Sequence, residues 1–318
     1  SYLILSFYIV VSGWTLEYLW LSLTGEISSV PEGVESTAYY SGIMNDAITS
    51  GFKPVMWTAI MIFLNLFVLL RGVHKGIERM ANTLMPTLFV ILVVLCGVSL
   101  TLPGASEGVD YFLRPDWSKF NANVLINAVG QAFFSLSLGM AAMVTYGSYI
   151  QKDQSLVSVS LTVTAATVLM AILAGLAIFP SVFTYGVEVT SGPALVFKTL
   201  PPLFAQLPGG RIVSVLFFVL LFFAAITSSF SLLEAGAAYI SEEWKFRGKP
   251  VTRVAALAIL FVLVGALSVV CALSQIEGSS LKILGFTVFD FTDLLTSNFI
   301  LPLGGIAACI LVGQSVDK

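Results

Sequence analysis

Long apolar runs separated by shorter polar segments dominate this sequence. Eight runs are at or near the ~20 residues that a helix needs to cross a ~30 Å hydrocarbon layer. A membrane β-barrel would instead show strands of about ten residues that alternate between apolar and polar positions. The pattern therefore predicts an all-α fold, a polytopic membrane helix bundle, because helices satisfy every backbone group internally. The expected spans, in one transmembrane domain over 1–318, are 2–22, 54–72, 83–103, 123–149, 156–184, 212–240, 254–274 and 284–313.

One segment, residues 185–211, fits neither a span nor a free loop. It is amphipathic, and Pro201, Pro202 and Pro208 interrupt any regular helix through it. The segment is too polar to cross a membrane and too apolar to stay in water. We expect an external lid that packs on the ends of the helices.

Composition supports hydrocarbon as the solvent of this chain. The 15 Lys and Arg and 18 Asp and Glu make up 10% of 318 residues, against about 25% in an average soluble domain. The net charge of −3 and the lack of a basic run argue against nucleic acid as a partner. No nucleophile–base pairing or metal-ligand spacing indicates an enzyme.

Lys and Arg are distributed unevenly among the loops. Most of them lie in 71–81, 151–155, 241–253 and the tail from 314, whereas the alternate loops are longer and poorer in positive charge. Cytoplasmic loops carry the excess of positive charge. We therefore expect a multi-pass protein of the cell (inner) membrane, with both ends of this sequence in the cytoplasm.

Small and polar residues gather at the middle of the run 123–149, around Ser137, Leu138 and Gly139. Two structures fit this pattern. The first is a continuous helix that packs closely through small residues, with hydroxyls bonded back to the preceding turn. The second is a helix interrupted near these residues, whose freed backbone groups line a site for an ion or a charged solute near the membrane midplane.

The segment 224–229, AAITSS, leaves the same choice open. Thr227, Ser228 and Ser229 either bond back to their own helix or offer hydroxyl oxygens to an alkali cation, for which hard oxygen donors are suited. A cation at this place requires further ligands from a partner helix.

Few ionisable or phenolic groups lie inside the spans, and each needs a partner or a function. Glu17 is expected at the membrane interface, and Glu234 serves either as a structural acceptor or in the functional site. Asp290 and Asp293 are candidates for an external gate that closes by pairing with a cation from another helix. The phenol of Tyr8 lies about 10 Å of helix rise into the first span and needs a polar partner.

Several strings together resemble the neurotransmitter:sodium symporters, in particular the bacterial leucine-transporter-like members. The resemblance covers most of the chain and implies the inverted-repeat sodium symporter fold. It matches the family's third to tenth transmembrane helices, so the sequence is expected to be a fragment that lacks the first two. The matching strings are RGVHKGIERMANTLMPTLFV (71–90), VGQAFFSLSLG (129–139), YGSYIQKDQ (146–154), KTLPPLFAQLPGG (198–210), FFAAITSS (222–229) and DLLTSN (293–298).

The resemblance implies sodium-coupled symport of an amino acid by alternating access. The Ala224 carbonyl and the hydroxyls of Thr227 and Ser228 match the family's second sodium site. Ser135 matches the hydroxyl of the first sodium site. Thr167 stands where the family has Asn or Asp, a departure that leaves a hydroxyl as the oxygen donor there.

Chloride dependence receives less support from the resemblance. Ala171 occupies the position of the family's chloride-linked Ser or its carboxylate substitute, and it offers neither group. Gln131 matches another member of that site. Na⁺ is therefore the ion that the resemblance implies most directly.

The resemblance also implies a substrate pocket. Tyr8 matches the phenol that binds the amino acid's carboxylate, Phe134 the ring that covers the pocket, and Asp293 the acid of the external gate. The carbonyls of the unwound stretch would accept the ammonium group, and an apolar wall favours a neutral, hydrophobic amino acid, with the Met pair adaptable in size. The unwound stretch corresponds to Ser137, Leu138 and Gly139, and the wall to Ile4, Met140, Met143 and Leu232.

Two further expectations follow. A non-transporting amino-acid receptor or interaction protein with the same fold is the alternative function, because Thr167 and Ala171 depart from the ion-site pattern. The chain also begins at Ser1 and is already apolar at Tyr2. As a fragment without the first helix, it is expected not to transport by itself.

Overall fold

The computed structural model describes residues 1–31, 33–71, 74–140, 142–147, 155–186, 189, 192–248 and 251–316. The predicted all-α class is confirmed over these residues, apart from one short hairpin. The first part of the chain holds α1 (Tyr2–Thr24), α2 (Ser36–Thr49), α3 (Lys53–Arg71), α4 (His74–Ser99), α5 (Ala105–Leu113), the 3₁₀ turn η1 (Trp117–Lys119), α6 (Ala122–Ser135) and α7 (Ala142–Gly147). The second part holds α8 (Leu156–Tyr185), α9 (Ala194–Gln206), α10 (Gly210–Phe246), α11 (Arg253–Ser274), β1 (Lys282–Ile283), β2 (Phe286–Thr287), α12 (Val288–Leu295), the π-helical turn η2 (Thr296–Ile300) and α13 (Leu301–Val316).

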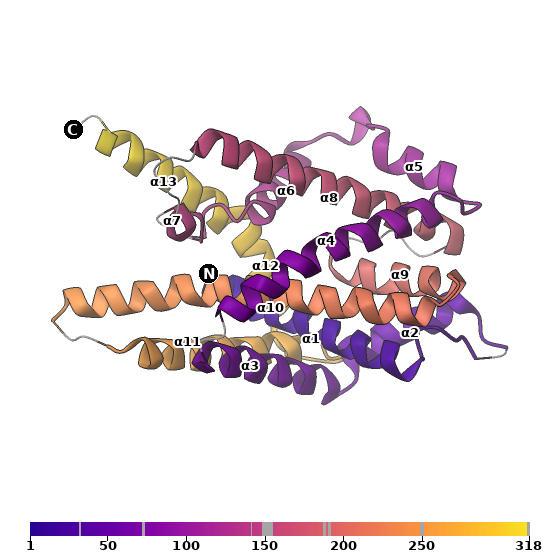
Figure 1. Cartoon of the computed structure of the whole chain (residues 1–318), viewed down its shortest axis with the longest axis horizontal. Helices are drawn as coiled ribbons and strands as arrows, with labels where there is room; N and C mark the ends of the chain where they lie inside the picture. The colour runs from indigo at the N-terminus through magenta and orange to yellow at the C-terminus, as the bar shows by residue number, and fades with distance from the viewer. Residues whose placement is uncertain are drawn as a thin grey trace.

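Helix α1 lies at the centre of a group of long helices that includes α3, α10 and α11 (Figure 1). In a second group, α4 and α5 both pack against α8. Helix α4 also contacts α10 and so joins the two groups. Helices α6 and α13 contact each other and both contact η2. Elements that are far apart in the sequence therefore surround α1.

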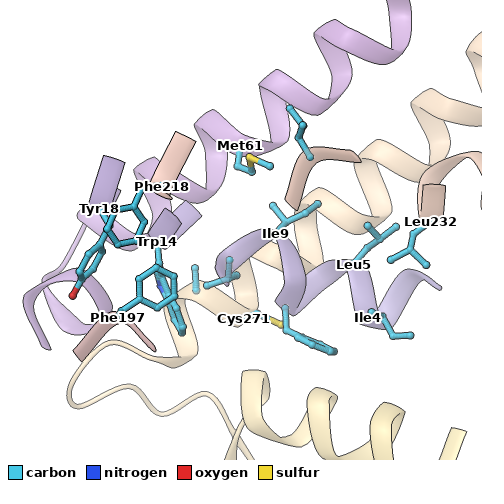
Figure 2. Packing of buried hydrophobic residues seen from close by; sticks show 14 of the residues in the cluster. Ile4, Leu5, Ile9, Trp14, Tyr18, Met61, Phe197, Phe218, Leu232 and Cys271 are labelled. Atoms are coloured by element: carbon cyan, nitrogen blue, oxygen red, sulfur yellow. The ribbon is translucent and has the colours of Figure 1, made fainter. Parts of the chain in front are cut away.

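Aromatic side chains fill the core beside the C-terminal half of α1, where Trp14 and Tyr18 face residues of α9 and α10 (Figure 2). The ring of Tyr18 lies 4.9 Å from that of Phe197 and 5.4 Å from that of Phe218, measured between centroids. Each such ring removes a large apolar area from the surface, and tilted pairs add a further ~1 kcal/mol. This cluster attaches α9 to the helices beneath it.

The predicted lid, residues 185–211, contains helix α9, which packs against α2, α8 and α10. Pro201 and Pro202 lie inside this helix, so the predicted interruption at these two prolines is wrong. Its inner side buries Phe197, Leu203 and Phe204. Residues 187–188 and 190–191 of the segment lie outside the described residues. Its location on the external side stays a prediction.

Five helical segments of the described chain are long and apolar enough to cross a membrane: Tyr2–Thr24, Leu156–Tyr185, Gly210–Phe246, Arg253–Ser274 and Val288–Gln314. A sixth consists of Ala38–Thr49 and Lys53–Leu69, which meet at a bend of 69°. The eight predicted spans differ from this set in three places. The run 54–72 overlaps only the second helix of the bent pair. The run 83–103 belongs to α4, whose apolar part, Met85–Ser99, is shorter, and the run 123–149 is broken between α6 and α7.

The carboxylate of Glu17 is buried within the protein, with 1% of the side chain exposed. Its position at the membrane interface stays a prediction. Its Oε1 lies 3.0 Å from Nζ of Lys53, and the same Nζ lies 2.5 Å from Oδ2 of Asp46. The lysine at the start of α3 therefore joins α1 to α2. An adjacent cation from another helix is what allows this carboxylate to be buried.

Candidate functional site

A cavity of about 270 Å³ lies between α1, α10 and the region of α9. Tyr8 and Ser12 of α1 line it opposite Ala224 and Ser228 of α10, and Phe197 lines it from the lid helix. Tyr8 and Ser228, from two different helices, thus border the same space. The structure thus brings together a predicted substrate-binding phenol and two of the predicted sodium ligands.

The predicted oxygens of the second sodium site lie within about one turn of α10. The Thr227 hydroxyl donates to the carbonyls of Phe223 (2.9 Å) and Ala224 (3.0 Å). This is the back-bonded geometry that polar residues adopt in apolar helices. The bond uses the hydroxyl proton and leaves the oxygen lone pairs of Thr227 available to a cation. Thr227 and Ser228 thus remain chemically fit to bind Na⁺ through oxygen.

The run 123–149 is an interrupted helix, so the second of the two predicted structures is the one observed. Helix α6 ends at Ser135, and the amide of Leu138 donates to the Phe133 carbonyl at 2.8 Å outside the helical pattern. Ser137 has a φ of 56° and Gly139 a φ of 72°. A left-handed conformation at two nearby positions ends the α-helix and frees backbone groups of both halves.

Gly139 is required for space as well as for its backbone conformation. A Cβ atom at this position would lie 2.1 Å from the Leu301 carbonyl oxygen. On the other side of the contact, a Cβ at Gly304 would lie 2.7 Å from the Gly139 carbonyl oxygen. The unwound segment therefore rests directly on the backbone of α13.

The remaining predicted pocket residues occupy different surroundings. Ile4 and Gly139 line a second cavity of about 170 Å³, together with residues of η2 and α13. The ring of Phe134 lies 6.3 Å from that of Phe7, the neighbour of Tyr8. Ile4, Met140 and Leu232 are buried, Leu138 is half-buried, and Met143 is exposed. Of the predicted substrate residues, Tyr8 thus borders the first cavity, and Ile4 and Gly139 border the second.

The two predicted oxygens of the first sodium site have separate partners. Ser135 accepts a hydrogen bond from Nε2 of Gln131 at 3.1 Å and is exposed. The Thr167 hydroxyl donates to the Val163 carbonyl of its own helix at 2.9 Å. Ala171, farther along the same helix, is exposed. Their joint role stays a prediction.

The candidate gate acid is held by its own segment. Oδ1 of Asp293 accepts a hydrogen bond from the Ser297 hydroxyl at 2.8 Å, and Oδ2 of Asp290 accepts one from Thr287 at 2.6 Å. The ring of Phe289, in the same helix, lies 6.0 Å from that of Phe7. Asp293 lies one turn after Phe289 in α12, and its pairing with a cation stays a prediction. Glu234 instead forms an ion pair between α10 and α11, with Oε2 2.6 Å from Arg253.

Sequence reasoning missed the residues that hold the interrupted helix in place. Nδ2 of Asn298 donates to Oδ1 of Asn127 at 2.7 Å, which links η2 to α6. Gly304 and Gly305 allow α13 to approach Gly139 and Phe133. Two signals were present in the sequence: amides inside apolar runs and a Gly-Gly pair inside a predicted span.

Comparison with known proteins agrees with this geometry. The family model described as "Sodium:neurotransmitter symporter family" matches residues 37–314. The chain is 35% identical, over 317 residues, to the uncharacterized sodium-dependent transporter YhdH of Bacillus subtilis, covering 100% of this chain and 68% of the relative. It is 32% identical to an uncharacterized sodium-dependent transporter of Haemophilus influenzae, covering 98% of this chain and 67% of the relative.

A solved structure extends the agreement to three dimensions. The structure of MhsT in complex with L-phenylalanine matches with a TM-score of 0.90 and 38% sequence identity, over 99% of this chain and 69% of that chain. At this identity and score the helices correspond along the whole described chain. This protein is a multi-pass membrane protein that belongs to the sodium:neurotransmitter symporter family.

Proposed function

We propose that this chain forms the greater part of a symporter that couples Na⁺ to the uptake of a neutral, hydrophobic amino acid by alternating access. One observation carries the proposal: Tyr8 of α1 and Ser228 of α10 line the same cavity. A phenol that binds the substrate carboxylate then lies next to a hydroxyl that binds the cation. Two ligands that stabilise the same conformation couple their binding.

The substrate class follows from the side chains around the unwound segment. Ile4, Met140 and Leu232 are apolar and buried, and the Phe134 ring covers this region beside Phe7. Such a wall binds an aliphatic or aromatic side chain by hydrophobic burial, and Met tolerates different shapes. The similar structure of MhsT contains L-phenylalanine, which supports the same substrate class here.

The test is binding of radiolabelled leucine and phenylalanine to the complete transporter that carries this chain. We expect binding to rise with Na⁺, and Ser228→Ala to increase the sodium concentration needed for half-saturation about tenfold, because a ligand oxygen is lost. Ser214→Ala is the matched control: its hydroxyl also lies in α10 but donates to the Arg211 carbonyl. Equal binding in potassium or choline buffer would refute the proposal.

A non-transporting receptor with the same pocket is the second candidate function. Thr167 and Ala171 support it, because they provide no carboxylate or amide at the ion-site positions. Uptake into proteoliposomes distinguishes the two functions. Sodium-driven accumulation supports the symporter, whereas sodium-dependent binding without accumulation supports the receptor.

A further inference from the structure

A buried hydrogen bond joins α3 to α10 directly beside the proposed sodium ligands. The Ser229 hydroxyl donates to Oδ1 of Asn65 at 2.7 Å, and both side chains are 0% exposed. The two residues are 164 positions apart in the sequence. An amide inside an apolar bundle is costly unless it is bonded, so this pair is a specific connection between the two helices.

The orientation of the Asn65 amide is fixed by its own helix. Its Nδ2 donates to the Met61 carbonyl at 2.9 Å, one turn earlier in α3. The amide oxygen is therefore the atom presented to α10. Ser229 also has the carbonyls of Ala225 (3.1 Å) and Ile226 (2.9 Å) within reach, and Asn65 is the shortest of the three contacts.

Ser229 directly follows the proposed ligand Ser228. Neighbouring residues of an α-helix point about 100° apart. Ser229 faces α3, while Ser228 lines the cavity beside Tyr8. A bond that holds Ser229 against α3 therefore also sets the rotation of α10 at the Ala224–Ser228 turn.

We propose that Asn65 is a positioning residue for sodium binding: through Ser229 it fixes the rotation of α10, so that Ala224 and Ser228 line the cavity. This inference rests on the proposed function. Asn65 does not contact the ion. Its contribution is to preorganise oxygens that would otherwise lose affinity through rotational freedom.

The test measures the sodium dependence of leucine binding to the complete transporter. We expect Asn65→Leu and Ser229→Ala each to raise the half-saturating sodium concentration about fivefold, which is ~1 kcal/mol at 1.4 kcal/mol per tenfold. The double variant should show no further rise, because both changes remove the same bond. Ser229→Thr keeps a hydroxyl and should stay within about twofold of wild type.

Two matched controls separate positioning from general stability. Thr58→Val alters a buried hydroxyl of α3 that donates to the Pro54 carbonyl of its own helix at 2.7 Å. Ser268→Ala alters a buried hydroxyl of α11 that donates to the Val264 carbonyl at 2.8 Å. Both should leave sodium dependence within about twofold of wild type, even where they lower the melting temperature.

Leucine affinity at saturating sodium and the preference for Na⁺ over Li⁺ complete the experiment. If Asn65 acts by positioning α10, Asn65→Leu should leave the leucine affinity at saturating sodium unchanged. It should also weaken the preference for Na⁺ over Li⁺. A half-saturating sodium concentration within twofold of wild type in folded Ser229→Ala would overturn the inference, as would equal shifts for sodium and leucine. Loss of sodium dependence in the wild type itself would overturn the proposed function and this inference with it.

Discussion

At the scale of single residues, Gly139 shows how far the sequence can predict the site. The cluster of small residues indicated either close packing or an interrupted helix, and no local feature decided between them. The deciding contact is with Leu301, which lies far away in the sequence and whose carbonyl oxygen would be 2.1 Å from a Cβ at this position. A contact between distant backbone segments leaves no periodic signal in either one.

Gly139→Ala should abolish sodium-dependent amino-acid binding, or weaken it more than tenfold. The added methyl group meets the α13 backbone and forces a φ of 72° on an L-residue, which by itself costs ~1 kcal/mol or more. Gly97→Ala is the control, since a Cβ at Gly97 meets no atom within 4 Å. Scintillation-proximity binding and melting temperature measure the two variants. Wild-type binding by Gly139→Ala would show that the site does not require this close contact with α13.

At the scale of elements, ion pairs connect helices that hydrophobic periodicity alone could not assign to one another. The sequence predicted α1 and α3 as spans and Glu17 near one end of its helix, but it identified no partner for this carboxylate. The structure buries Glu17 because Lys53, at the start of α3, reaches both Glu17 and Asp46 of α2. A charge partner in another helix cannot be recognised from spacing within one helix, which is why the ion pair was not predicted.

Lys53→Met should lower the thermal stability of the protein, because it leaves the Glu17 carboxylate buried without a cation. Removing one partner of a fully buried ion pair lowers the free energy of unfolding by several kcal/mol. We expect a loss of about 2 kcal/mol here, because Lys53 is 39% exposed. The double variant Glu17→Gln/Lys53→Met should recover most of this loss.

Lys119→Met is the matched control for Lys53→Met. Lys119 is 78% exposed and pairs with Asp116 at 3.3 Å within one turn, so its loss should hardly change the melting temperature. Fluorescence-detected thermal unfolding in detergent compares the four proteins. Equal melting temperatures for Lys53→Met and wild type would show that the buried ion pair does not stabilise the packing of α1 against α3.

At the scale of the whole molecule, composition and hydropathy predicted the class of protein, and family strings predicted the fold. Both are confirmed by the helical structure, the family match and the TM-score of 0.90 to MhsT. The residues alone did not predict which parts of the site lie together in space. The sequence placed Tyr8 and Ser228 in separate helices, and their shared cavity depends on the packing of α1 against α10.

Residues 1–318 produced on their own should show no sodium-dependent leucine binding. The three proposed oxygens of the second sodium site all come from Ala224, Thr227 and Ser228 of α10, and an alkali cation requires ligands from more than one direction. Equilibrium dialysis with and without Na⁺ measures this, with the complete transporter as the positive control. Micromolar sodium-dependent affinity in the isolated chain would show that its own residues complete the site.

The cavity that Tyr8 and Ser228 share has a thermodynamic consequence. Linkage requires that whatever factor sodium adds to amino-acid affinity, the amino acid adds to sodium affinity. Because both groups line one cavity, this reciprocity arises locally and needs no relay through the bundle. Under the proposed function, a scarcity of amino acid then leaves sodium weakly held. The same shared cavity therefore limits the entry of sodium alone.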